Sequence, residues 1–264
     1  MLRAGTRVAP LVAVALTSAF APAERASAPT ADQVIAKLIA ARGGRAKLAS
    51  VHTARLFGII TFANGVGGPL VVSIARPPRI RSQFTMNGRT MTQGYDGHVA
   101  WLFDGSAAHP LNADQSANVA AGADFDGPLV DYAAKGNRVT LVGLDTADGR
   151  PAYDIRVTLA SGLVDDYFID TVTWMQAKWR GGRKEDTVAV VYESWFRDYR
   201  KIGGVQFAFR IDSRTVGRPG SQLIALDSVQ LNPALAPDLF TMPAAAPARC
   251  ASAWDRRTSR ASRT

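Results

Sequence analysis

The stretch Arg55-Leu56-Phe57-Gly58-Ile59-Ile60-Thr61-Phe62 decides the fold, because its apolar side chains fall on both faces of an extended strand. Residues 187–196 repeat the pattern, with Val188, Val190 and Tyr192 opposed by Val191 and Trp195. Strands that are apolar on both faces need a cover on each side. A β-sheet curved around an apolar cavity with helices as a lid meets this need, and so does a well-packed β-sandwich, which the residues alone favour.

Outward from this stretch the chain is rich in short strands. Turn dipeptides such as Asn64-Gly65, Asn87-Gly88 and Asp104-Gly105 separate apolar runs, as in antiparallel hairpins. Strands are predicted near residues 52–63, 69–76, 79–86, 89–95 and 98–103, and again near 138–144, 151–160, 163–169, 172–180, 187–199, 205–213 and 221–231.

Two helical segments accompany the strands. Thr30 with Gln33 forms a capping box before the stripe Val34, Ile35, Leu38 and Ile39, which ends at Gly43-Gly44. Between the two runs of strands, we expect a helix with Asp126 as its cap, Pro128 in its first turn and Gly136 after its end.

The two ends of the chain differ from its body. Residues 1–23 hold Arg3 and Arg7, an uncharged apolar run and small residues up to Ala23, which predicts a secretory signal peptide cleaved after Ala23. Residues 244–264 combine five arginines with one acidic residue and one aromatic, and are predicted to be a disordered basic tail. Residues 24–243 are expected to form a single β domain.

The formal net charge of +9 does not indicate a nucleic-acid partner. The predicted signal and tail carry most of the excess, which leaves 24 basic against 21 acidic residues between positions 24 and 243. The aromatic residues of the body lie among Val, Ile and Leu rather than on a basic face. What remains is a tail able to make transient contact with an anionic membrane surface.

No catalytic or metal-binding pattern stands out. His52, His98 and His109 lack metal-ligand spacing, and the single cysteine, Cys250, has no partner for a disulfide. The sequence has no G-x-S-x-G, H-E-x-x-H or P-loop motif. We therefore expect neither a cofactor, nor a metal, nor enzyme activity, although an enzyme with a dispersed site stays an alternative.

Several motifs, in order, resemble the periplasmic outer-membrane lipoprotein carriers and their lipoprotein-sorting-like relatives. The stretches are Val71-Val-Ser-Ile-Ala-Arg-Pro-Pro-Arg-Ile-Arg81, Thr92-Gln-Gly-Tyr-Asp-Gly-His-Val-Ala-Trp-Leu-Phe103, Asp124-Phe-Asp-Gly-Pro-Leu-Val-Asp-Tyr132 and Leu239-Phe-Thr-Met-Pro243. The resemblance implies a mainly β (α+β) fold with a helical lid: an incomplete antiparallel barrel of about eleven strands that closes over helices around an apolar cavity.

The resemblance also implies a function, which is periplasmic binding and transport of lipid or acylated lipoprotein by a monomer. It assigns Arg76 to locking the lid through hydrogen bonds. An alternative is a lipid-sensing regulatory module on the same fold. Residues expected to line the cavity and contact the acyl chains are Leu56, Ile60, Phe62, Phe84, Trp101 and Phe103.

Overall fold

The computed structural model describes residues 28–185 and 188–244, without the side chains of Lys184 and Glu185. The predicted signal peptide and residues 245–264 of the predicted tail lie outside these ranges. No helix among the described residues has the length and apolar character needed to span a membrane.

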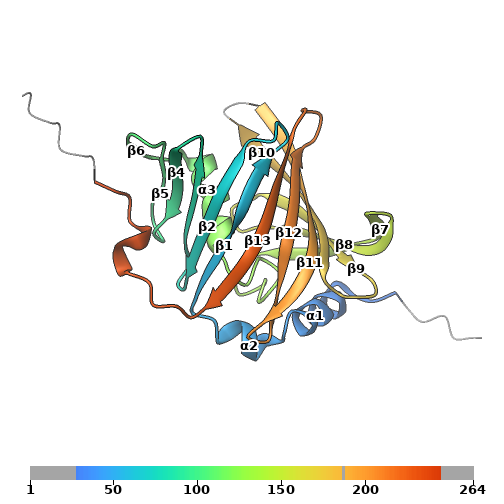
Figure 1. Ribbon diagram of the computed structural model, residues 1–264. Helices are drawn as coiled ribbons and strands as arrows, with labels where there is room; N and C mark the ends of the chain where they lie inside the picture. Colours follow the sequence, from blue (N-terminus) through green and yellow to red (C-terminus); the bar gives the residue numbers. More distant parts are fainter. Residues whose placement is uncertain (1–27, 186–187, 245–264) are drawn as a thin grey trace, which may run out of the picture.

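The described residues form one antiparallel sheet of 13 strands (Figure 1). Its order is β6-β5-β4-β3-β2-β1-β13-β12-β11-β10-β9-β8-β7, so nearly every strand pairs with its sequence neighbours. The strands are β1 (Thr53–Phe62), β2 (Gly67–Ala75), β3 (Arg79–Met86), β4 (Arg89–Tyr95), β5 (Ala100–Phe103), β6 (Ala108–Pro110), β7 (Arg138–Ala147), β8 (Arg150–Thr158), β9 (Val164–Asp170), β10 (Gln176–Glu185), β11 (Val188–Ile202), β12 (Val205–Thr215) and β13 (Ser221–Leu231). About eleven strands were expected, and the short edge strand β6 is one that the sequence did not indicate.

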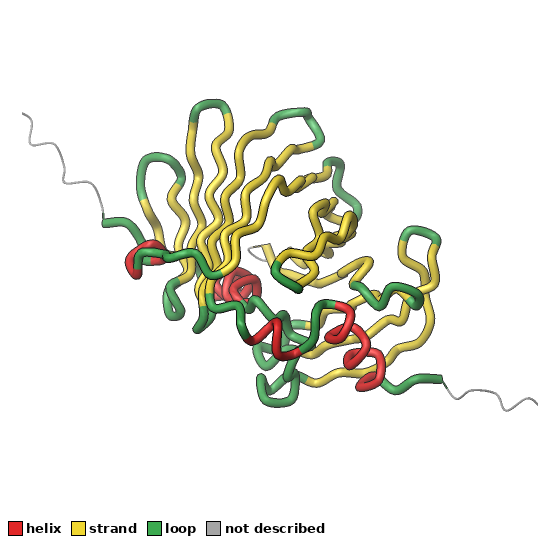
Figure 2. The backbone as a smooth tube through the Cα atoms, turned by 60° about the horizontal axis from the view of Figure 1, so that its bottom comes forward, coloured by secondary structure: helices red, strands yellow, loops and turns green. Residues whose placement is uncertain are grey.

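The sheet bends around a central space but does not close, because its terminal strands β6 and β7 do not pair with each other (Figure 2). Helix α3 (Ala113–Ala123) contacts β3, β4 and β5 on one flank and β10 on the other. Five strands lie between β3 and β10 in the sheet, so one short helix can contact both only if the sheet curls. The incomplete barrel with a helical lid is confirmed, and the sandwich is not observed.

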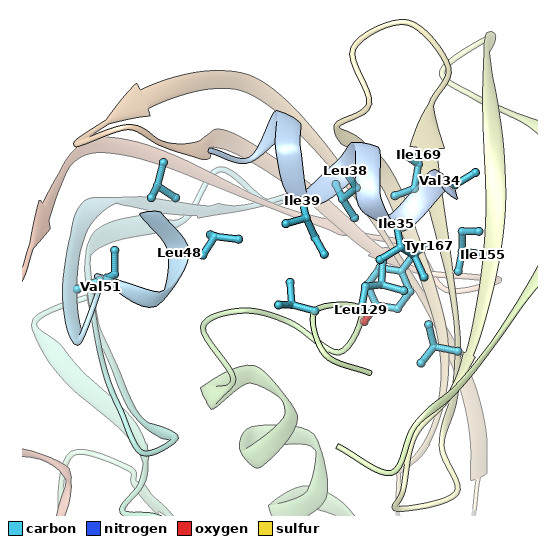
Figure 3. Packing of buried hydrophobic residues seen from close by; sticks show 14 residues of the cluster. Val34, Ile35, Leu38, Ile39, Leu48, Val51, Leu129, Ile155, Tyr167 and Ile169 are labelled. Atoms are coloured by element: carbon cyan, nitrogen blue, oxygen red, sulfur yellow. The ribbon is translucent and has the colours of Figure 1, made fainter. Parts of the chain in front are cut away.

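Helix α1 (Ala31–Ala41) begins as predicted, with the reciprocal capping box of Thr30 and Gln33. Its apolar stripe, Val34, Ile35, Leu38 and Ile39, is buried. Figure 3 shows Val34 and Ile35 beside Ile155, Tyr167 and Ile169 of β8 and β9, and Ile39 on the side of Leu48 and Leu129 in the same cluster. Each buried aliphatic side chain of this kind contributes about 1.5–3 kcal/mol, so the stripe fixes α1 firmly to one flank.

The link from α1 to α2 (Arg45–Ala49) requires a glycine. Gly43 has φ +123°, and a Cβ atom there would lie 2.2 Å from the Gly204 carbonyl oxygen. The close approach allows Gln206 N–H to donate to the Arg42 carbonyl at 3.0 Å. This hydrogen bond attaches the backbone at Arg42 to the first residues of β12.

The predicted helix capped by Asp126 is wrong in its position. The helix is α3, which begins after Asn112 with its own capping box to Gln115, and residues 125–136 run in turns. The alanine-rich segment before Asp124 is the better helix former, whereas Gly127 and Asp131 adopt positive φ. Arg76 engages the Asp126 carboxylate, which therefore caps no helix.

A short 3-10 helix, η1 (Pro237–Phe240), ends the described chain and packs beside β3. Phe240 is buried, and its carbonyl accepts a hydrogen bond of 2.8 Å from the indole N–H of Trp101. The guanidinium of Arg79 lies 5.2 Å from the centre of the Phe240 ring. These contacts hold the segment after β13 against the first strands of the sheet.

Candidate functional site

The concave face of the sheet contains two adjoining cavities, which we call the narrow chamber and the wide chamber. Their volumes are about 470 Å³ and about 840 Å³. Seven residues line both and so form the neck between them: Ala121, Gly122, Asp124, Pro128, Tyr167, Gln176 and Phe196. Each chamber is of the size that proteins use for organic ligands.

The narrow chamber has aliphatic and aromatic walls. Side chains that alternate along β1, β2, β12 and β13 face it, because paired residues in an antiparallel sheet point to the same side. Leu56 is opposite Val72, and Ile211 is opposite Ile224, so four strands contribute to one apolar surface. Gln206 also lines it, with its side-chain oxygen buried and without a hydrogen-bond partner.

Helix α3 covers the chambers with small side chains. Ala117, Ala120, Ala121 and Gly122 all line the wide chamber. A Cβ atom added at Gly122 would meet no atom within 4 Å. The small residues on this face of the helix thus leave open the space that larger ones would fill.

Arg76 connects the lid to the sheet. Its Nη1 and Nη2 lie 2.6 Å from the two carboxylate oxygens of Asp126, while Nε donates to the Val51 carbonyl at 2.8 Å and Nη2 to the Leu48 carbonyl at 3.2 Å. We call Arg76 and Asp126 the latch. The hydrogen bond to Asp126 raises the pKa of Arg76, although burial opposes the shift. One guanidinium joins the end of β2, the α2 region and the segment after α3.

Two further cations hold the segment after α3. Arg42 donates to the carbonyls of Asp126 and Phe125, and Lys135 Nζ lies 2.6 Å from the Asp124 carboxylate. Burial lowers the pKa of Arg42, with the nearby carboxylates opposing this effect. Burial tends to raise the pKa of Asp126, but the hydrogen bond and charge of Arg76, with the charges of Lys135 and Arg42, keep it below its ordinary value.

Four of the six predicted cavity residues lie on the concave face. Leu56 lines the narrow chamber, and its contact with an acyl chain stays a prediction. Ile60, Phe62 and Phe84 share its face, and the rings of Phe62 and Phe84 are 6.4 Å apart. These three line neither chamber in the described part of the chain, so their contact with a ligand stays a prediction.

Trp101 and Phe103 were wrongly predicted to line the cavity. Pairing across β4, β3 and β2 places Leu102 on the same face as Leu56, so its neighbours Trp101 and Phe103 lie on the opposite, convex face. There the Trp101 ring packs over Gly94, where an added Cβ would lie 2.4 Å from the indole. Trp101 is a core residue between the sheet and η1.

The sequence also left important residues unassigned. Asp126 was assigned to a helix cap. Arg42, and the narrow-chamber residues Tyr167 and Phe207, were not singled out. The alternation of Phe207, Phe209 and Ile211 in β12 was a usable signal for one lining strand. The partners of Arg42 and Asp126 are 84 and 50 residues away, so local spacing could not reveal them.

The described side chains include no group of three His, Cys, Asp or Glu residues placed to hold a metal ion. The chain matches no family model, and it matches none of the curated proteins.

Solved structures do match it. A DUF1329 family protein from Desulfovibrio piger aligns with TM-score 0.55 and 10% identity over 80% of this chain and 96% of that one. A LolA superfamily protein from Nitrosomonas europaea aligns with TM-score 0.54 and 13% identity over 81% of this chain and 98% of that one. A Vibrio parahaemolyticus domain described as an outer membrane lipoprotein-sorting protein aligns with TM-score 0.54 and 8% identity over 80% of this chain and 97% of that one. The chain therefore shares the fold of these three solved structures, and the fold that the resemblance implied is confirmed.

Proposed function

We propose that the protein is a periplasmic carrier that binds a lipid or an acylated lipoprotein in the two chambers and moves it between membranes without catalysis. The observation that carries the proposal is an apolar chamber covered by a lid that one arginine attaches to the sheet. The carrier fold supports the proposal. The expected signal peptide at residues 1–23 accounts for delivery to the periplasm.

The energetics of acyl chains explain why a carrier needs such a chamber. Exposing a sixteen-carbon chain to water costs about 12 kcal/mol at about 0.8 kcal/mol for each methylene group. The walls formed by Leu56, Val72, Ile211 and Ile224 offer an apolar surface in place of water. A soluble protein that supplies this surface makes transfer through an aqueous compartment possible.

The latch gives the lid a closed position. A guanidinium has five N–H donors in a fixed arrangement, and in Arg76 they serve two carbonyls and a carboxylate from separate segments. When an acyl chain enters, the segment after α3 moves outward and these partners exchange their hydrogen bonds for water. Opening the lid therefore exchanges the polar contacts of Arg76 for water, and it also requires a shift of Leu129 and Val130, which are buried in the core with α1, β8 and β9.

The proposal includes a monomeric carrier whose partners are acyl chains or lipoproteins, with no role for nucleic acid. The arginines of the predicted tail then bring the carrier close to anionic headgroups, each near-surface charge contributing about 1 kcal/mol.

A fluorescent fatty acid tests ligand binding, and a pair of variants tests its location. Ile224 lines the narrow chamber, whereas Ile59 lies on the convex face and is 49% exposed. We expect the unaltered protein and Ile59→Gln to bind the probe with equal affinity and Ile224→Gln to bind it about tenfold more weakly, because a buried amide lacks partners there. Equal affinity in all three proteins would show that the probe does not bind in the narrow chamber.

A further inference from the structure

The convex face of the first strands carries three arginines close together. Arg55 of β1 is opposite Ser73 of β2, and Ser73 is opposite Arg81 of β3, so the three residues form one row across the sheet. Because Leu56 lines the narrow chamber, its neighbour Arg55 and the rest of this row point to the other side of the sheet. Arg79 precedes Arg81 by two positions in β3 and shares its face. We call Arg55, Arg79 and Arg81 the arginine patch.

The two arginines of the row are held near each other. Ser73, between them, is only 3% exposed although it lies on the outer face of the sheet. Side chains directly opposite each other on paired strands are about 5 Å apart, so the long side chains of Arg55 and Arg81 are placed to cover it. Burial, and then the charge of Arg55, lower the pKa of Arg81. Two like charges therefore share a small area of the surface.

The ends of these guanidiniums have no protein partner. Neither Arg55 nor Arg81 forms a hydrogen bond or an ion pair within the described chain, although Arg55 lies 5.4 Å from the centre of the Phe57 ring. Arg55 Nε is sealed from solvent, whereas its Nη atoms and the Arg81 guanidinium are accessible. Arg79 donates from Nη2 to the Arg76 carbonyl at 3.3 Å and pairs with no carboxylate among the described residues. The accessible N–H groups of the row are thus free to meet a ligand.

Further along the same face, arginines are paired within the protein. Arg156 of β8 pairs with Asp166 at 2.8 Å, and Arg214 of β12 pairs with Glu193 at 2.6 Å. The sheet therefore supplies internal counterions across β8 to β12, and the structure describes none for the arginine patch. A cluster of charges of one sign attracts and concentrates ions of the other sign. The counterion of the arginine patch is then expected to come from outside the chain.

We propose that the arginine patch is a binding site for a phosphate group, either of a soluble phosphate compound or of a lipid head. The planar fork of a guanidinium matches two oxygens of a phosphate. Arg55 and Arg81 approach one anion from two sides, and its charge offsets the repulsion between them. Arg79 adds a third positive charge beside the row. The site lies on the opposite face of the sheet from the chambers and is additional to the proposed carrier function.

The first test is calorimetric titration of the full chain with inorganic phosphate. We expect saturable binding that Arg55→Gln and Arg81→Gln each weaken about tenfold or more, because each removes charge-assisted hydrogen bonds. The matched control is Arg89→Gln, which makes the same charge change at an exposed position where β4 begins. It should bind phosphate within about twofold of the unaltered protein. Absence of saturable binding, or an equal loss in Arg89→Gln, would overturn the proposal.

Thermal unfolding separates binding from packing. In chloride, Arg81→Gln should unfold at a temperature no lower than the unaltered protein, because it removes a repulsion between like charges. Phosphate at equal ionic strength should stabilise the unaltered protein and Arg89→Gln more than Arg81→Gln, since its general salt effect is common to all three. A lower unfolding temperature of Arg81→Gln in both salts, by equal amounts, would assign Arg81 to packing alone and contradict the site.

Vesicles distinguish the two sources of the phosphate group. The measurement is sedimentation of the four full-length proteins with phosphatidylglycerol vesicles, in which the predicted basic tail contributes equally to each. A loss of sedimentation confined to Arg55→Gln and Arg81→Gln would support a lipid head as the ligand. Equal sedimentation of all four, together with the phosphate binding described above, would support a soluble phosphate compound. Binding of the fluorescent fatty acid should be the same in all four proteins, so failure of the site and failure of the carrier function are separate results.

Discussion

Arg76 and Asp126 form a two-bond ion pair between the end of β2 and the segment after α3, with both guanidinium–carboxylate distances 2.6 Å. Asp126 is only 14% exposed and Arg76 30%, so the pair is stronger than one on the open surface. It is one polar connection of the segment after α3, which also places Leu129 and Val130 in the apolar core with α1, β8 and β9.

Arg76→Leu is expected to loosen the lid and to lower the free energy of unfolding by about 2 kcal/mol, because the Asp126 carboxylate stays partly buried without its partner. Hydrogen exchange of amides 124–137 should become at least about tenfold faster, with little change in α1. The control is Arg156→Leu, which removes an ion pair with a 50% exposed arginine and should cost under about 1 kcal/mol. Exchange that is equally slow in both variants would show that Arg76 does not hold the lid.

Gly122→Leu is expected to block ligand entry while leaving the fold intact. The position is helical, and an added Cβ meets nothing within 4 Å, so replacing this glycine should raise helix stability by up to about 1 kcal/mol. The larger side chain occupies the neck and should lower affinity for the fluorescent fatty acid about tenfold or more. Thermal unfolding and probe titration measure the two effects.

The matched control is Ala36→Leu, an exposed position on α1 that lines neither chamber of the described chain. Full probe binding by Gly122→Leu would mean that the ligand does not pass between the chambers.

Asp154 gives the protein an unusual dependence on pH. It is 6% exposed, its Oδ1 is buried without a partner, and burial with the nearby Asp166 raises its pKa to about 6. A carboxyl whose pKa is raised by folding stabilises the protein fully below its ordinary pKa of 3.8. That contribution is lost as the pH rises through about 6.

Asp154→Asn should therefore raise the free energy of unfolding by about 2 kcal/mol at pH 7 and leave it nearly unchanged at pH 4. Urea titrations at both pH values measure the difference. A variant that is destabilised equally at pH 4 and pH 7 would show that Asp154 is ionised and paired throughout.

Trp101→Phe should affect stability and not ligand binding. The substitution removes the hydrogen bond to the buried Phe240 carbonyl and should cost about 1–3 kcal/mol. Because Trp101 lies on the convex face, affinity for the fatty acid probe should stay within about twofold of the unaltered protein. A large loss of affinity in a folded variant would show that Trp101 lines the cavity, which would contradict the strand register.

Local patterns in the sequence predicted what local physics controls. The capping box of Thr30 and the stripe from Val34 to Ile39 define α1 with no further information. The predicted strand near residues 151–160 is β8, in which Tyr153, Ile155 and Val157 alternate with polar residues and all three pack in the core cluster. Strands apolar on both faces predicted that the sheet needs a second cover, which α3 and the segment after it supply.

What the sequence could not provide depends on pairing over long distances. Residues 99–103 are all apolar, so a period of two does not tell which face Trp101 occupies, and only its register against β4 decides this. Asp126, Gly127 and Pro128 have the composition of a helix start, but Arg76 engages the Asp126 carboxylate from 50 residues away. The two chambers likewise arise from the curl of the whole sheet.

Native mass spectrometry of the protein, purified from cells without detergent, tests the central claim most directly. We predict that the folded protein retains a mass excess of one lipid or acyl chain, which organic extraction removes and added lipid restores. A bare chain that also fails to take up added lipid would contradict the carrier function.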